Sequence, residues 1–230
     1  TLFRLKHSDE MAVVEMGTSG PNEIRPLSLA TEPNIAVITN IGASHLERLQ
    51  DLEGVYREKI NITAGLQEGG LLIVNADDPH LSRVRSTKRY KVMTFGIRRG
   101  ILKPENLKFD ENACASFRIG RVEYHLNVPG IHNVYNALAA IAVGESLRIP
   151  KTEIAKALDA FAATGMRMEI RNAFGFRVVS DCYNANPSST RMALQTIGNL
   201  SNANHRIAVL GDMLELGTDA SKLHFEIGQM

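Results

Sequence analysis

The sequence has no long hydrophobic run, little net charge and only two cysteines. Its apolar stretches are all shorter than the roughly 20 residues of a membrane-spanning helix, and no signal peptide is visible, so we expect no membrane insertion. With 26 basic and 25 acidic residues, the net charge of +1 gives no electrostatic reason to expect a nucleic-acid partner. Cys114 and Cys182 lie far apart and in no metal-binding spacing, which favours a reducing cytoplasm over a disulfide framework.

Several catalytic motifs are also missing. The sequence contains no GxxxxGK[ST], no GxSxG, no HExxH and no GxGxxG after an expected strand. The first absence removes the backbone cradle with which P-loop enzymes hold phosphates. The others argue against a serine hydrolase, a zinc protease and a dinucleotide-dependent dehydrogenase. Any anionic ligand must therefore be met by a local site of another kind.

Short apolar runs alternate with helical patterns along the first hundred residues. This alternation predicts an α/β fold with a mainly parallel sheet flanked by helices. The expected strands cover residues 11–17, 34–42 and 70–78, and the expected helix covers residues 52–66. Ligands of such sheets collect at the carboxyl ends of the strands, so polar residues at those ends are the first candidates for a site.

The pattern changes after residue 100. Residues 105–128 alternate apolar and polar side chains around Gly120 and Arg121, which predicts an antiparallel hairpin. The spacing of apolar residues then predicts two successive helices, over 130–149 and 151–163. Further along we expect strands over 176–181 and 205–212, a helix from Pro187 to Leu200, and another helix from about Ser221.

We place a domain boundary near residues 163–167 and divide the chain into residues 1–165 and 166–230. The second unit is too short to complete a doubly wound domain. The chain begins with Thr1 and ends inside an expected helix, so we expect it to be a piece of a longer protein.

Glu15 and His45 each lie near the carboxyl end of an expected strand. A carboxylate there can hold a hard cation such as Mg²⁺, or it can cap a helix or pair with a lysine. His45 can be a ligand, a general base or a loop residue. Lys59 lies in the following helix, where a solvated lysine is the commoner reading. Its ammonium would repel a nearby cation unless it lost its charge.

Four other polar residues are candidates for a ligand site, and three of them have two readings each. Asn133 and Asn136 share a face at an expected helix start, where their amides can pair with a purine edge or cap the helix. Asp181 ends an expected strand and can accept hydrogen bonds from ribose hydroxyls or fill an Asx turn. Arg167 lies between the two units and could contact a phosphate by charge-assisted hydrogen bonds.

Eight motifs in one order along the chain resemble those of the Mur ligase family. They are VVEMGTSGPNEI, ITNIGASHLERL, EGVYREK, NADD, GIHNVYNALAA, GMRMEI, SDCYNANPSS and VLGDMLELG. YNANP and LGDMLELG are most similar to members that join D-alanyl-D-alanine to UDP-N-acetylmuramoyl-tripeptide. The resemblance implies that residues 1–165 form most of a central ATP-binding ligase domain without its P-loop. Residues 166–230 would begin a Rossmann-like carboxy-terminal ligase domain.

The resemblance also implies a reaction. ATP phosphorylates the tripeptide's carboxylate, and the amine of the dipeptide attacks the acyl phosphate, with two Mg²⁺ ions stabilising the phosphoryl charge. By motif position, Glu15 and His45 match metal ligands. Lys59 matches a lysine that is carbamylated in this family, which turns a cation into an anionic oxygen ligand. Of these residues, His45 and Lys59 would also be catalytic.

The resemblance assigns the remaining candidates to the nucleotide. Asn133 and Asn136 match an adenine-contacting pair, Asp181 a ribose contact, and Arg167 a catalytic arginine near the γ-phosphate. The segments around Asn184, Asn186 and Asp212 match parts of the family that face the active-site cleft.

The biological setting follows from the same resemblance. It implies a cytoplasmic, monomeric enzyme of peptidoglycan synthesis, which supports cell-wall formation, cell shape and cell division, while the chain by itself would be inactive. Two alternatives stay open. One is another amino-acid ligase of the Mur or folylpolyglutamate type, and the other is a catalytically silent nucleotide-binding or scaffold protein.

Overall fold

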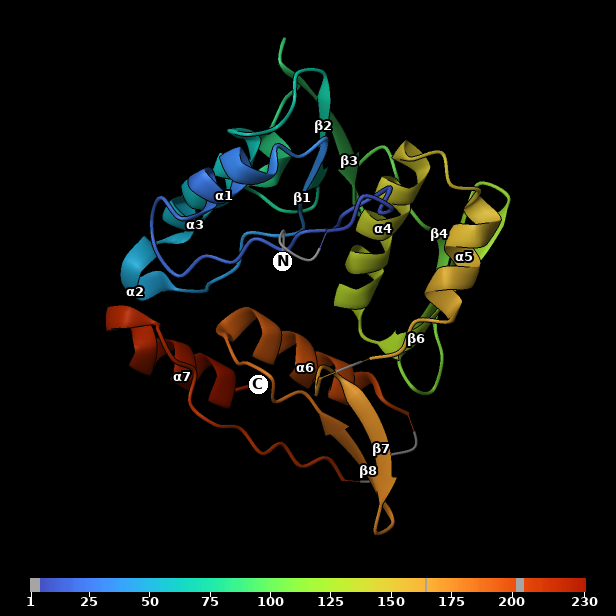
Figure 1. Cartoon of the computed structure of the whole chain (residues 1–230). Helices are drawn as coiled ribbons and strands as arrows, with labels where there is room; N and C mark the ends of the chain where they lie inside the picture. The colour runs from blue at the N-terminus through green and yellow to red at the C-terminus, as the bar shows by residue number, and fades with distance from the viewer. Residues whose placement is uncertain (1–4, 164, 202–204) are drawn as a thin grey trace.

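The computed structural model describes residues 5–163, 165–201 and 205–230. Residues 5–163, here called the first part, contain a parallel sheet, an antiparallel sheet and their helices (Figure 1). Residues 165–230, called the second part, contain a hairpin and the two helices at the bottom of the same view. None of the helices in the described ranges combines the length and apolarity that a bilayer span requires.

The first sheet is parallel, as the apolar runs predict. Its strands β1 (Ile35–Ile38) and β3 (Tyr90–Phe95) pair on either side of β2 (Gly70–Asn75). Successive side chains of β2 point to opposite faces, so Leu72 and Ile73 are both fully buried but in different apolar clusters. Burial on both faces explains why this strand is a continuous apolar run.

Helices cover the two faces of the parallel sheet. Leu49 of α2 (Leu46–Leu49) and Val55 of α3 (Leu52–Ile60) belong to the apolar cluster on one face. α4 (Ile131–Ser146) packs against β2 and β3 from the other face (Figure 1). The short helix α1 (Ile24–Thr31) packs against α3 and against the short 3-10 helix η2 (Asn61–Thr63), which follows α3. The predicted helix over 52–66 is therefore confirmed as α3 followed by η2.

The second sheet is antiparallel. It consists of β4 (Glu105–Phe109), β5 (Cys114–Ile119) and β6 (Val122–Pro129), and β5 and β6 form the predicted hairpin. Gly120 has a φ of 61° in the connecting turn, a conformation that glycine adopts without strain. α5 (Lys151–Asp159) packs against β6, as the second of the two predicted helices.

The second part begins with the antiparallel pair β7 (Glu169–Ala173) and β8 (Phe176–Ser180). β8 matches an expected strand, whereas the sequence did not predict β7. The helix α6 (Pro187–Asn199) begins as predicted, because the Asn186 side chain accepts a hydrogen bond from the Ser189 N–H. The chain continues through η4 (Gly217–Asp219) into α7 (Ala220–Gly228), which confirms the last expected helix.

Two expected strands are wrong. Residues 11–17 and 205–212 form neither a strand nor a helix within the described part of the chain. Val13 is 95% exposed and Val209 is 93% exposed. A strand exists only where a neighbouring strand shares its backbone hydrogen bonds, and an apolar pattern does not state whether such a neighbour is present.

The described residues of the two parts contact each other through helices and turns. α6 lies against α4, and the turn η4 lies against α2. Both α2 and the start of α4 are close to the carboxyl ends of the parallel strands, so the second part faces the edge of the sheet at which ligands of α/β proteins bind.

Candidate active site

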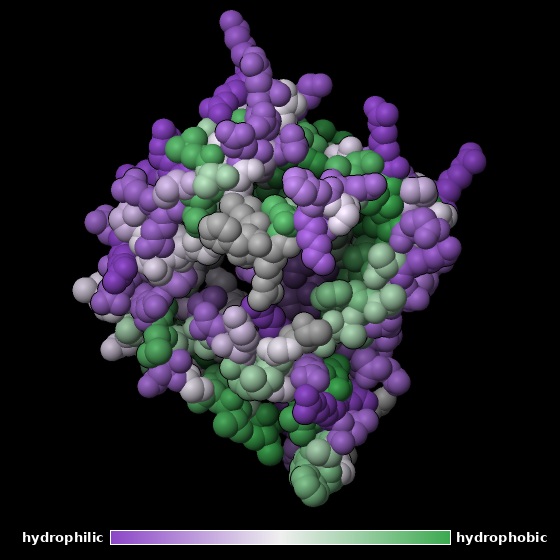
Figure 2. Space-filling model, viewed as in Figure 1, coloured by the Kyte–Doolittle hydropathy of each residue, from purple (hydrophilic) through white to green (hydrophobic). Residues whose placement is uncertain are grey.

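A cleft of about 880 Å³ lies between the two parts. Residues that follow β1 and β2 line it, together with the first turns of α4, and residues of the second part close its other side. The face shown in Figure 2 is hollowed between the upper and lower regions of the molecule. The cleft therefore lies where the topology of the parallel sheet predicts a ligand.

Most of the sequence-predicted site residues line this cleft. They are Lys59, Asn133, Asn136, Arg167, Asp181, Asn184 and Asn186. They come from α3, α4 and the second part, so segments far apart in the sequence converge on one space. Glu15, His45 and Asp212 are not among the lining residues.

Lys59 is half-buried, at the end of α3. Its Nζ donates a hydrogen bond to the carbonyl oxygen of Asn40 at 3.0 Å. Burial lowers the pKa of Lys59, although the negative charge of Asp78 opposes this effect. The amine therefore loses its proton more readily than an exposed lysine does.

Two carboxylates after β2 hold the backbone around the cleft, and their individual roles were not predicted from the sequence. Asp78 accepts the Ile41 N–H at 2.7 Å, which fixes the segment after β1. Asp77 accepts three backbone N–H groups of residues 97–99 and the hydroxyl of Tyr135. Burial alone would raise the pKa of Asp77, but the hydrogen bonds from the Arg98 N–H and the Tyr135 hydroxyl lower it. The sequence feature that could have pointed to these two residues is the pair of consecutive aspartates in the NADD motif.

Three side chains at the start of α4 form a hydrogen-bonded series. Asn133 Nδ2 donates to the Pro129 carbonyl at 2.8 Å and lies 3.2 Å from His132 Nε2. Asn136 Nδ2 donates to Asn133 Oδ1 at 3.1 Å. Gly130 occupies the N-cap position, so the alternative in which these asparagines cap the helix is not observed. His132, which lines the cleft, was not singled out from the sequence.

The second part contributes a basic and an acidic side chain. The Arg167 guanidinium lies over the ring of Tyr183, 4.2 Å from its centroid. Asp181 Oδ1 accepts the Met168 N–H at 3.0 Å, which ties the segment before β7 to the end of β8. Tyr183 also lines the cleft, and sequence reasoning missed it.

His45 lies at the first turn of α2, with a φ of 53°. Its Nδ1 contacts the carboxylate of Glu215 in the second part, and the backbone of Glu215 accepts the Glu47 N–H at 3.1 Å. Glu15 is exposed and makes no hydrogen bond or ion pair within the described ranges. No three His, Cys, Asp or Glu side chains of the described residues form a metal-binding group.

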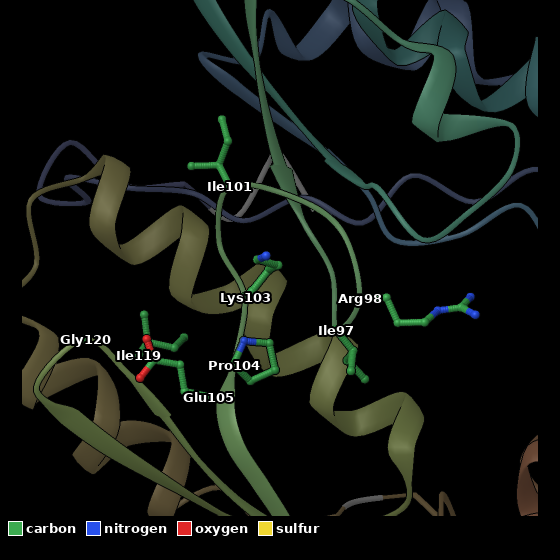
Figure 3. Close-up of a pocket in the computed structure, with 8 residues that line it drawn as sticks. All are labelled: Ile97, Arg98, Ile101, Lys103, Pro104, Glu105, Ile119 and Gly120. Carbon is green, nitrogen blue, oxygen red and sulfur yellow. The ribbon is translucent and has the colours of Figure 1, made fainter.

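A second pocket, of about 470 Å³, lies between the loop that follows β3 and the β5–β6 turn (Figure 3). Its lining combines Ile97, Ile101 and Pro104 with the charged side chains of Lys103 and Glu105. None of the sequence-predicted site residues lines it. The first cleft is therefore the better candidate for the active site.

Two family models match the chain. The Mur ligase middle domain matches residues 1–144, and the glutamate ligase domain of Mur ligases matches residues 166–230. A UDP-N-acetylmuramoyl-tripeptide–D-alanyl-D-alanine ligase of Bacillus subtilis is 38% identical over 233 residues, covering 99% of this chain and 50% of that protein. The ligase of the same name from Escherichia coli is 32% identical, covering 100% of this chain and 52% of that protein.

The same similarity appears among solved structures. The crystal structure of MurF from Acinetobacter baumannii superimposes with a TM-score of 0.92 and 29% sequence identity. The superposition covers 99% of this chain and 50% of the MurF chain. The chain thus spans about half the length of the curated relatives it matches.

Proposed function

The chain belongs to the Mur ligase family, and we propose that the complete protein joins D-alanyl-D-alanine to UDP-N-acetylmuramoyl-tripeptide with ATP. The observation that carries this proposal is similarity over essentially the whole chain to ligases of this one name. The product amide would be part of a peptidoglycan precursor. We place the reaction in the cytoplasm, where the nucleotide-linked precursor and ATP are found, and propose a monomeric enzyme.

We assign residues 1–165 to an ATP-binding ligase domain and residues 166–230 to part of a carboxy-terminal ligase domain. The extents of the two matched family models support this division. The cleft between the two parts would then hold ATP and the two substrates. A site between domains lets each domain contribute groups that meet only when the substrates are bound.

The nucleotide assignment rests on the cleft's polar side chains. Asn133 and Asn136 form the adenine end of the site, and Asp181 accepts hydrogen bonds from the ribose hydroxyls. Arg167 faces the γ-phosphate, where a guanidinium can donate two hydrogen bonds to phosphoryl oxygens. The common cleft lined by all four residues supports this arrangement.

Glu15, His45 and a carbamylated Lys59 are our proposed ligands for two Mg²⁺ ions. Lys59 fits this role because its burial favours the neutral amine, whose nitrogen can attack CO₂ and release a proton to form an anionic carbamate. His45 fits because its Nδ1 contacts a carboxylate, which leaves Nε2 for a metal, a common arrangement of metal-bound histidines. Bound Mg²⁺ would supply positive charge against the phosphoryl oxygens.

The reaction has two steps. An oxygen of the tripeptide's terminal carboxylate attacks the γ-phosphorus of ATP, and ADP leaves. The amine of D-alanyl-D-alanine then attacks the acyl carbon, and the tetrahedral intermediate loses phosphate and a proton to give the amide. Arg167 would stabilise the phosphoryl group in both steps, because negative charge builds on the oxygens that it faces.

The assay is ADP release by the product of the complete gene, with UDP-N-acetylmuramoyl-tripeptide and ATP. We expect release to depend on D-alanyl-D-alanine, and not on L-alanine, D-glutamate or a diamino acid in its place. Dependence on one of these other amines would assign the protein to another Mur-type ligase. ADP binding without turnover on any acceptor would favour a silent nucleotide-binding protein.

A pair of arginine variants tests the site within the same assay. Arg167→Met should lower kcat on the order of a hundredfold, the usual effect of removing one donor to a developing oxyanion. Arg121→Met, in the β5–β6 turn, is the matched control because Arg121 is exposed and outside the cleft. Equal activity of the two variants would remove Arg167 from the mechanism.

A further inference from the structure

The Glu215 side chain of the second part sets the position of the proton on the His45 ring of the first part. A carboxylate only accepts hydrogen bonds, so His45 Nδ1 carries the proton in this contact and donates a hydrogen bond to Glu215. Nε2 of the neutral ring then keeps its lone pair, and it makes no hydrogen bond within the described residues. The nitrogen that a metal ion can use is therefore determined by a residue from across the boundary between the two parts.

The backbone beside Glu215 contacts the same helix as its side chain does. The Glu47 N–H, in the first turn of α2, donates to the Glu215 carbonyl oxygen at 3.1 Å. Gly217 approaches Glu47 so closely that a Cβ on Gly217 would lie 3.3 Å from Glu47 Cα. The φ of Gly217 is 64°, a conformation that glycine adopts without strain. The carboxylate of Glu215 is therefore brought to His45 by a backbone that lies on α2, and not by the reach of its side chain alone.

The loop that carries Glu215 is anchored in the second part. Met213 and Leu216, which flank Glu215, are 4% and 3% exposed and belong to one apolar cluster with α7. The Met213 N–H donates to Nε2 of His224 on α7 at 3.0 Å. Glu215 is thus fixed to the second part, whereas His45 belongs to the first part. Their contact exists only while the two parts are held against each other.

His45 and Glu215 both have backbone conformations that are uncommon for residues with a Cβ. The φ of His45 is 53° and that of Glu215 is 61°. Such left-handed conformations are unfavourable and persist where the surrounding structure determines them, often at functional sites. The fold thus holds an unfavourable backbone at each end of this one contact, which indicates that the contact has a task.

We infer that Glu215 is a positioning residue for the proposed metal site, because it presents His45 Nε2 to the ion only when the two parts are in contact. The inference rests on the proposed role of His45 as a Mg²⁺ ligand. It adds a residue of the second part to a site whose proposed ligands, Glu15, His45 and Lys59, all lie in the first part. Because linked equilibria are reciprocal, ion binding and contact between the parts favour each other.

The first test measures Mn²⁺ binding to the complete protein, with free Mn²⁺ counted by EPR at a fixed ADP concentration. Mn²⁺ accepts the same hard ligands as Mg²⁺. Glu215→Leu should weaken binding on the order of tenfold to a hundredfold, the usual effect of removing the partner of a metal-bound histidine. Glu215→Gln keeps an accepting oxygen and should stay within about threefold of the wild type. Glu226→Leu is the matched control and should bind as the wild type does, because the ion pair of Glu226 with Arg191 lies within the second part and outside the cleft.

The metal dependence of ADP release distinguishes positioning from a structural role. In Glu215→Leu, the MgCl₂ concentration for half-maximal release should rise about tenfold, while kcat at saturating MgCl₂ stays within about threefold of the wild type. A damaged fold would instead lower kcat at every metal concentration.

Hydrogen exchange of the complete protein tests the link between the two parts. MgCl₂ with ADP should slow exchange in the wild-type peptides that cover residues 45–50 and 213–217, because the Glu47 N–H is bonded to Glu215 while the parts are in contact. Glu215→Leu should lose this protection in both peptides, and Glu226→Leu should keep it.

The outcomes separate this inference from the proposed function. If His45→Ala binds Mn²⁺ as tightly as the wild type does, the proposed metal role of His45 fails. If His45→Ala weakens binding but Glu215→Leu does not, the inference is overturned while the metal site stands. Should Glu215→Leu fail to fold, ¹⁵N NMR of the wild type decides, because an unprotonated Nδ1 on His45 would contradict the assigned hydrogen bond.

Discussion

Removing the Glu58 carboxylate should loosen the start of α1. Glu58 lies on α3, is only 3% exposed, and accepts the backbone N–H groups of Asn22, Glu23 and Ile24 at 2.7, 2.8 and 2.7 Å. Within the described residues, the N-cap residue Glu23 makes no side-chain cap bond of its own. The first turn of α1 is therefore capped by a residue from a different helix.

The structure gives a magnitude for this change. A hydrogen bond to a charged acceptor contributes about 1.5–3 kcal/mol, and Glu58→Ala breaks three of them. Water can reach part of the freed backbone, so we expect a loss of about 3–5 kcal/mol in the free energy of unfolding. Glu58→Gln keeps one oxygen and should lose about 1–3 kcal/mol.

Hydrogen exchange of the complete protein, read by mass spectrometry, measures the effect locally. The peptide that covers residues 22–31 should exchange faster in Glu58→Ala, and urea unfolding should shift in the same direction. Glu68→Ala is the matched control, since Glu68 is exposed and should change the unfolding free energy by less than about 0.5 kcal/mol. Equal exchange in the two variants would refute the cap.

Two further predictions concern titrating groups of the cleft. Lys59→Ala should abolish ADP release, and short carboxylates should partly restore it; full activity of the variant would remove Lys59 from the mechanism. Burial and the hydrogen bond to Asp77 raise the pKa of Tyr135 to about 12. The unfolded chain loses this proton near pH 10, so the contribution is present below pH 10 and is lost as the pH rises to about 12. Tyrosinate absorbance of the wild type minus Tyr135→Phe should therefore titrate near pH 12, and a titration near pH 10 would contradict the contact.

The sequence predicts correctly those elements whose burial follows from their own local pattern of apolar and turn residues. β2 was predicted because its continuous apolar run requires cover on both faces, and α3 and α4 supply that cover. The β5–β6 hairpin was predicted because alternation and a glycine turn specify it locally. Residues 205–212 have an equally apolar pattern, but Val209 is almost fully exposed. Apolar periodicity reports a preference for burial and not the presence of a partner.

The site was predictable by residue type but not by hydrogen-bond direction. Motif position picked out Asn133 and Asn136 as a pair, and both line the cleft. In the fold, the Pro129 carbonyl sets the orientation of both amides, and the sequence does not predict this because Pro129 carries no polar side chain. The contact between His45 and Glu215 was not predicted for a different reason, because the two residues are 170 positions apart in the sequence.

Contacts within the second part position its own site residues. Asp181 accepts the Met168 N–H, and Arg167, the residue before Met168, stacks on Tyr183, two positions after Asp181. The two segments that carry the proposed ribose and phosphate contacts are thus tied to each other twice. Binding then requires less ordering of these side chains, so their contribution to affinity depends on contacts within the second part as well as on charge. A lone arginine and a lone aspartate in the sequence become one preorganised unit in the fold.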